Sequence, residues 1–222
     1  MAHLTLFQPH FSRRDFAPRE RGFSMLEVLV TLIIVTVGLL GLAGLNARAH
    51  VSELESYQRA QALVMVSDMV ERIRVNRLNA SCFAITTASA GGPSYGTGSS
   101  AFTSCAGGSA AQNTLADNSK TEWNNLLDGA SETASVGGTT TNVGSMIGAR
   151  GCVSYNSASE LTNAASGTPM SGTGVYTVSV AWQGMADTVA NATFLCGTGQ
   201  YGSETKRRVV STAFRIANLQ LN

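Results

Sequence analysis

The sequence predicts an α+β protein in which one long N-terminal helix packs on an antiparallel β-sheet. Two observations point to the helix: an apolar run at 23–47, and an amphipathic helical stretch that continues it to residue 80. A third points to the sheet, because the segments 176–182 and 209–216 alternate apolar and polar residues as strands do. With 222 residues, the chain has room for one globular domain, at 81–222, beyond the helix.

The apolar run is the first element. From residue 23 to residue 47 the only ionisable side chain is Glu27, and about 20 apolar residues suffice for a helix to cross a bilayer. Residues 1–22 carry four arginines against two acidic residues, a flank that stays in the cytoplasm. We therefore expect a single-pass membrane helix with its N-terminus in the cytoplasm and its C-terminal domain on the opposite side of the membrane.

A conventional secretory signal is the alternative interpretation of this run. Ala47-Arg48-Ala49 offers small residues of the kind that such a cleavage site needs. However, the run exceeds the usual h-region of about 7–15 residues and leads without a break into further helical sequence. We therefore expect the apolar helix to be retained.

The junction at the start of the run resembles the N-terminal signal of type IV prepilins and pseudopilins. It reads Gly22-Phe23-Ser24-Met25-Leu26-Glu27. In that family a prepilin peptidase cuts after the glycine and methylates the new N-terminal phenylalanine. The resemblance implies that 1–22 is a leader peptide, that Gly22 and Phe23 form the processing site, and that Phe23 and Glu27 dock the subunit during assembly.

Further stretches, at 38–45, 57–62 and 69–74, make the chain similar to PilV-type minor pilins. The resemblance implies a pilin-like fold, no enzymatic activity and no cofactor. It also implies a location in the bacterial inner membrane, with the N-terminus cytoplasmic and the C-terminal domain periplasmic, and then in the pilus. The implied partners are other minor and major pilin subunits, the prepilin peptidase, the inner-membrane pilus assembly platform and, before assembly, the lipid bilayer. The implied role is to initiate or modify pilus assembly in twitching motility and adhesion.

Glu27 also has a physical explanation of its own. A carboxylate inside a membrane costs several kcal/mol unless it is paired. The charged N-terminal amine of Phe23 in an adjacent subunit would offset that cost and fix the axial register. The alternative hypothesis is that Glu27 lies near the interface and extends into the headgroups.

Three glycines, Gly38, Gly41 and Gly44, lie within the apolar helix, where each costs about 0.5–1 kcal/mol relative to alanine. They either let neighbouring helices approach closely or mark a segment that unwinds in the filament, as the resemblance to pilins suggests. We favour unwinding, although a continuous helix in the isolated subunit fits both hypotheses.

The amphipathic arm at 48–80 contains neither Pro nor Gly. We expect its apolar face to pack on the domain and its acidic residues, such as Glu53 and Glu71, to face away. The predicted apolar face consists of Val51, Leu54, Ala62, Met65, Val66, Met69 and Ile73.

All four cysteines follow the membrane segment, on the side where thiols oxidise, so we expect two disulfides. Four cysteines allow three pairings. We favour Cys82 with Cys105, which closes a Gly/Ser-rich loop, and Cys152 with Cys196, which joins two predicted strands. Since no pair has C-x-x-C spacing, we predict no metal site.

The domain also contains weaker signals. Ser119-Lys120-Thr121-Glu122 has capping-box spacing and predicts a short helix that ends before Gly129. Short strands are expected at 152–155 and 193–196, and loops at 86–108 and 136–147.

Composition argues against catalysis and nucleic-acid binding. Without residues 1–22 the chain has 11 basic and 12 acidic residues, a net charge of −1. Only His50 lies beyond residue 22, too few histidines for a His-based triad or a multi-His metal centre. The G-x-G-x-x-G spacing at 197–202 precedes a strand pattern, whereas dinucleotide binding needs a helix there. Ser203-x-x-Lys206 lacks the companion motifs of serine acyl-enzymes.

The sequence therefore favours a non-enzymatic minor pilin. One alternative is an adhesin displayed at the pilus tip, with the segments at 86–108 and 136–147 as contact loops. The other is a pseudopilin of a type II secretion system.

Overall fold

A computed structural model describes residues 22–87, 92–99, 102–144 and 146–217 of the chain. The chain divides into two compact units, one ending at Ala47 and the other beginning at Arg48. Most of the expected leader, residues 1–21, lies outside the described residues, as do parts of the expected loop at 86–108.

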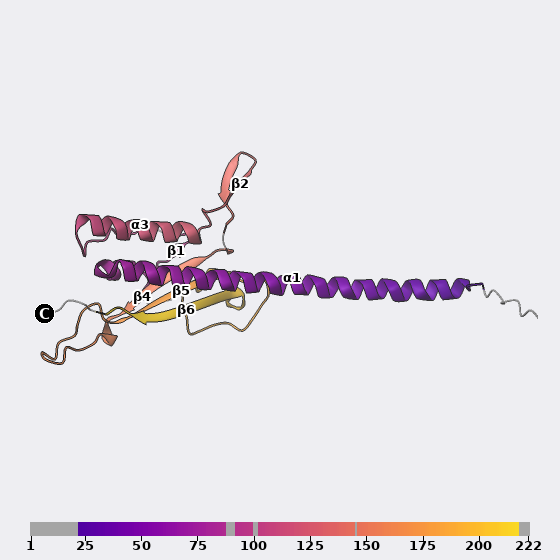
Figure 1. The fold of residues 1–222 in the computed structure, drawn as a ribbon. Coiled ribbons are helices and arrows are strands. Elements are labelled where there is room, and N and C mark those ends of the chain that lie inside the picture. The colour runs from indigo at the N-terminus through magenta and orange to yellow at the C-terminus, as the bar shows by residue number, and fades with distance from the viewer. Residues whose placement is uncertain (1–21, 88–91, 100–101, 145, 218–222) are drawn as a thin grey trace, which may run out of the picture. The chain divides into compact units, whose positions relative to one another are not determined.

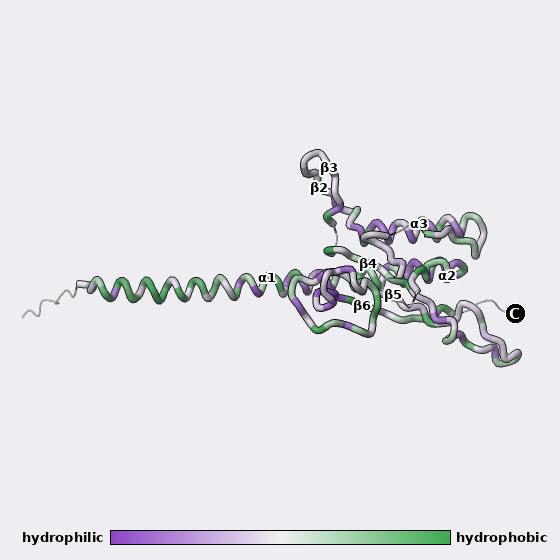
Figure 2. Tube along the Cα trace, turned by 180° about the vertical axis from the view of Figure 1, so that it is seen from behind, coloured by the Kyte–Doolittle hydropathy of each residue, from purple (hydrophilic) through white to green (hydrophobic). Residues whose placement is uncertain are grey.

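The first unit consists, where described, of the N-terminal part of helix α1, which runs from Met25 to Val75. The helix is continuous through Gly38, Gly41 and Gly44, and an added Cβ at any of them would meet no atom within 4 Å. Among the described residues, α1 alone is long and apolar enough to span a membrane, and none of its most apolar window is buried. Figure 2 shows this stretch as nearly continuous hydrophobic colour.

The second unit begins with the remainder of α1. The polypeptide then forms short helical turns, a second long helix and the strands. These elements are η1 Arg77–Asn79, α2 Ala80–Phe83, β1 Tyr95–Gly96, α3 Ala110–Leu127, β2 Thr133–Val136, β3 Thr139–Asn142, β4 Arg150–Asn156, η2 Ser157–Ser159, β5 Val175–Gln183, η3 Glu204–Lys206 and β6 Arg207–Arg215.

In the described part of the chain, β1, β4, β5 and β6 form one antiparallel sheet in that order, and β2 pairs with β3 in a separate hairpin. β5 and β6 are the two segments with the clearest alternation in the sequence, and Val180 pairs with Val210 across them. In the second unit, α3 runs alongside α1, and the main sheet lies close to α1 (Figure 1). The predicted α+β fold is thus confirmed.

The core lies between the helices and one face of the sheet. Val178, Val180 and Trp182 of β5 belong to this core together with residues of α1 and α3. Trp123 of α3 is fully buried and lies against Gly151 of β4, where any side chain would collide with the indole ring. The opposite face of the sheet carries Cys152 and Ala181, which pack with Cys196 and Tyr201 of the segment after β5.

The apolar face of the arm is only partly as predicted. Ala62, Val66, Met69 and Ile73 are buried, but Val51 and Leu54 remain 37% and 47% exposed. The arm meets the domain at this level through the carboxylate of Glu55, so Leu54 beside it and Val51 one turn earlier have no core to enter.

Two further predictions are wrong. The helix expected from Ser119 begins ten residues earlier, because Ser109 and Gln112 form the capping box, and the hydroxyl of Ser119 instead donates to the carbonyl of Leu115 within the helix. Residues 193–196 are not a strand. The Asn191 side chain accepts from the amides of Thr193 and Phe194, which turns the chain out of an extended conformation.

Candidate functional site

The first candidate site is the start of α1. The Ser24 hydroxyl accepts from the amide of Leu26, and the Ser24 carbonyl accepts from the amide of Glu27, so Ser24 opens the helix. Glu27 therefore lies in the first turn, where a carboxylate also suits the positive end of the helix dipole. Phe23, one residue before Ser24, is 84% exposed. The structure thus places the expected processing and docking residues within about one helical turn.

The apolar part of α1 presents its side chains outward, from Leu26 to Leu45. The hydroxyls of its two threonines bond within the helix. Thr31 donates to the carbonyl of Val28 and Thr36 to that of Ile33, each at 2.8 Å. A helix surface whose polar groups are internally bonded can enter lipid, or contact other such helices, without leaving a donor unpaired.

Two family models match this region. The prokaryotic N-terminal methylation motif matches residues 17–43, which include Gly22, Phe23 and Glu27. The type IV pilin family Tt1218 matches residues 44–118. Residues 17–118 are therefore similar to type IV pilins. No curated protein and no solved structure matches the chain.

Glu55 joins the arm to the start of β6 and to the residues that follow β5. Its Oε1 accepts from the amides of Met185 and Ala186 and from the guanidinium of Arg208, each at 3.0 Å. The hydrogen bond from Ala186 makes the largest contribution to a lowered pKa of the Glu55 carboxyl; desolvation opposes it, and Arg208 adds to it. Arg208 also donates to carbonyls of the segment after β5, so one ion pair holds α1, β6 and that segment together.

Glu55→Gln should lower the free energy of unfolding by about 1–2 kcal/mol near neutral pH, because two amides and Arg208 lose a charged acceptor. The folded-state pKa of Glu55 lies below 4.5, so its stabilising contribution is complete above that value and is lost as the pH falls through the lowered pKa. Urea melts of the full chain in detergent, at neutral and acidic pH, measure this difference. Glu53→Gln is the control, since Glu53 is exposed and, among the described residues, its ion pair is the 3.8 Å contact with His50. A difference from wild type that persists undiminished in acid would contradict the assignment.

The first disulfide lies beside a buried ion pair. Cys82 is bonded to Cys105, with 5.5 Å between their Cα atoms. The Lys120 side chain, 1% exposed, lies 3.0 Å from Asp117 and donates to the Thr103 carbonyl at 2.7 Å and to the Cys82 sulfur at 3.1 Å. Burial tends to raise the pKa of Asp117, but hydrogen bonds from Lys120 and the Cys105 amide outweigh it and hold the pKa below its usual value.

Cys82, Cys105 and Asp117 also lie close enough together to resemble a set of metal ligands. The two sulfurs are bonded to each other, and the ammonium of Lys120 already faces both Cys82 and the carboxylate. Cysteine binds a metal ion as a free thiolate, and the Lys120 ammonium would repel a cation placed between these groups. This cluster therefore does not fit a metal ion.

The second disulfide, Cys152 with Cys196, fastens the segment after β5 to the outer face of the sheet. Both pairs are the ones favoured from the sequence. Arg207, 3% exposed, reinforces this segment by donating to the carbonyls of Asn191, Phe194 and Cys196. The Nε of Arg207 pairs with the Glu204 carboxylate at 2.6 Å. A hydrogen bond from the Gly199 amide lowers the pKa of the Glu204 carboxyl most, and Arg207 lowers it further.

The G-x-G-x-x-G spacing at 197–202 falls in this same segment. All three glycines have positive φ and form turns, and the chain continues through η3 into β6. Dinucleotide binding requires a long helix after the motif, and here a strand follows instead. The motif therefore lacks the geometry that binds a dinucleotide.

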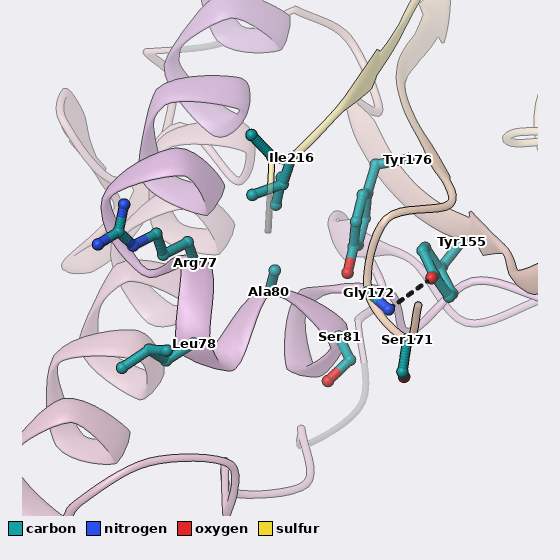
Figure 3. Close-up of a pocket in the computed structure, with 10 residues that line it drawn as sticks. Arg77, Leu78, Ala80, Ser81, Tyr155, Ser171, Gly172, Tyr176 and Ile216 are labelled. Atoms are coloured by element: carbon teal, nitrogen blue, oxygen red, sulfur yellow. Dashed lines mark hydrogen bonds between the residues drawn. The ribbon is translucent and has the colours of Figure 1, made fainter. Parts of the chain in front are cut away.

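A hollow of about 320 Å³ lies between α2, the end of β6 and the loop before β5. In Figure 3 the hydroxyl of Tyr176 points into this hollow, near Ala80 and Ser81. Burial, aided by Tyr155 and Glu160, raises the pKa of Tyr176 to about 12. Tyr155 donates to Glu160 at 2.5 Å and accepts from the Gly172 amide. These phenols stay protonated near neutral pH, so these two side chains offer the hollow hydrogen bonds rather than a base.

Sequence reasoning missed the contacts made by Glu55, Lys120 and Arg207. Each joins residues far apart in the chain or depends on a loop conformation, and a single charged residue carries no periodic signal. The one local signal that was available is the Ser109-x-x-Gln112 spacing before α3, which would have placed that helix correctly.

Proposed function

We propose that this chain is a minor type IV pilin, a non-enzymatic subunit that initiates or modifies pilus assembly. The observation that supports this most is the methylation motif at 17–43 on a helix whose first turn holds Glu27 and whose apolar surface is exposed. Residues 1–22 would be the leader, removed by a prepilin peptidase after Gly22 on the cytoplasmic side of the inner membrane. Residues 23–47 would then anchor the subunit in the membrane and later contact other pilins.

In this proposal the methylated amine of Phe23 on one subunit and the Glu27 carboxylate on another form an ion pair in a low-dielectric environment. Such a pair offsets the cost of burying either charge and fixes the axial position of the incoming subunit. The arm at 48–80 connects this helix to the globular residues 81–222, whose two disulfides suit an oxidising periplasm.

Glu27→Ala should leave membrane insertion and leader cleavage intact but reduce the amount of the protein in sheared pili by about tenfold or more, since one ion pair in an apolar environment readily contributes 1.4 kcal/mol. Immunoblots of membrane and pilus fractions measure both quantities. Thr31→Val, one turn further along, is the control, because that hydroxyl bonds only within its own helix. Equal entry of Glu27→Ala and wild type into pili would refute the docking role.

The alternative within the same class is a pseudopilin of a type II secretion system. Deletion of the gene separates the two: loss of pili or twitching supports the proposal, and loss of protein secretion with normal pili overturns it.

A further inference from the structure

The β2–β3 hairpin projects away from the helices and the main sheet of its unit (Figures 1 and 2). Gly137 and Gly138, with φ of +60° and +81°, form its two-residue turn, which matches a type I′ turn. At its base, Asn142 donates to the Asp128 side chain at 3.0 Å, and the amide of Gly144 donates to the carbonyl of Gly129 at 3.2 Å. The hairpin is therefore fixed at one end and free of the main sheet.

The hairpin's own register shows which backbone groups it leaves unused. The two-residue turn makes Val136 and Thr139, which flank it, a hydrogen-bonded pair. In an antiparallel ladder such pairs alternate with pairs whose N–H and C=O groups point outward. The amide of Val143 donates to the carbonyl of Glu132 at 2.8 Å, which agrees with this alternation four residues further along each strand. Counting along the register, the outward groups on β3 are those of Thr140 and Asn142, and those on β2 are Thr133 and Ser135.

These edges lack the usual protection. Proteins discourage strand addition at an exposed edge with charged residues, prolines or bulges. From residue 133 to residue 144 the sequence has neither a charge nor a proline, and every residue of β3 is exposed. A two-stranded hairpin is marginally stable in water, and an added strand would supply it with further main-chain hydrogen bonds. The hairpin thus has both the free hydrogen-bonding groups and the energetic reason to take up another strand.

We propose that the outer edge of β3 is a docking site for an extended, uncharged segment of a neighbouring pilin subunit, which adds to the hairpin as a third strand. Thr139, Thr140 and Thr141 are consecutive β-branched residues, which makes β3 the better template of the two edges. Main-chain hydrogen bonds supply the affinity in such strand addition. The neighbour follows from the proposed function, because subunits held together by their N-terminal helices bring globular domains to fixed mutual positions.

The test uses one outward amide. Thr140→Pro removes both the Thr140 hydroxyl and a backbone N–H that the hairpin itself does not use. Thr140→Val removes the hydroxyl alone and is therefore the matched control. Thr140→Asp, which adds a charge at the edge, is a second variant for the case that proline disturbs the hairpin. We expect the Pro and Asp variants to enter sheared pili about tenfold less than wild type and Thr140→Val to enter normally. A photo-crosslinking residue at position 141 should link the chain to an extended, uncharged peptide of another pilin.

Three outcomes would overturn this inference: Pro and Asp variants that enter pili like Thr140→Val, a crosslink confined to this chain itself, or an effect seen only with Ser135→Pro on the β2 edge. Failure of the proposed function is distinguishable, because in that case wild type with both Glu27 and the hairpin intact would already be absent from pili.

Discussion

Trp123→Ala should lower the free energy of unfolding by about 3–5 kcal/mol, the range for removing a fully buried tryptophan. The indole ring packs edge-on against Tyr95, with 5.1 Å between the ring centroids, and covers Gly151 of β4. Its N–H donates to the carbonyl of Met65 in α1 at 3.0 Å. One side chain therefore connects α3, α1 and the sheet, and alanine would leave a cavity at their junction.

Urea unfolding of the full chain in detergent, followed by circular dichroism, measures this loss. Trp123→Phe is the matched control, because it keeps an aromatic ring but lacks the N–H donor, and it should cost clearly less than alanine. A Trp123→Ala variant that unfolds within about 1 kcal/mol of wild type, which is roughly the error of such melts, would show that the core does not depend on this contact.

Asp117→Asn should cost about 2 kcal/mol, and more than Lys120→Met does. The Lys120 side chain is 1% exposed and Asp117 32%, so neutralising the acid leaves an ammonium in the interior, while removing the lysine leaves a carboxylate that water can still reach. Breaking a buried pair typically costs about 3–5 kcal/mol, which we reduce because Asp117 is partly solvated.

The two variants, compared in the same urea melts, give the sign of the difference directly. The methionine side chain has a length similar to that of lysine and occupies much of the same buried space. The comparison therefore isolates the effect of leaving the Lys120 ammonium buried without the Asp117 carboxylate. A larger loss for Lys120→Met than for Asp117→Asn would mean that the hydrogen bond to the Thr103 carbonyl matters more than the ion pair.

The sequence predicted best those features that repeat along the chain. The long helix and strands β5 and β6 extend over many residues with a steady period, so local deviations do not hide them. The junction at Gly22 and Phe23 was predicted from a resemblance, and the matching methylation motif covers it. The disulfide pairing followed from loop size and predicted strands, which restrict which sulfurs can meet.

The failures occur where long-range contacts decide the conformation. Residues 193–196 have a strand-like composition, but Arg207 draws the carbonyls of Phe194 and Cys196 toward one guanidinium, which an extended ladder would not permit. Strand β1, only two residues long, exists because Tyr95 and Gly96 pair with β4, and no periodic signal fits in two residues. Val51 is apolar and on the correct helical face, yet its exposure depends on where the domain ends.

The contacts along the C-terminal part of α1 also determine how the domain bears tension. Glu55 holds Arg208, Met65 accepts from Trp123, and Arg72 bridges Asp68 of α1 and Glu122 of α3 at 2.7 Å each. These anchors are spread over about 25 Å of helix at 1.5 Å per residue. A pull along the helix axis would load these contacts together in shear, so we expect the C-terminal part of α1 to resist being drawn away from α3 and the sheet.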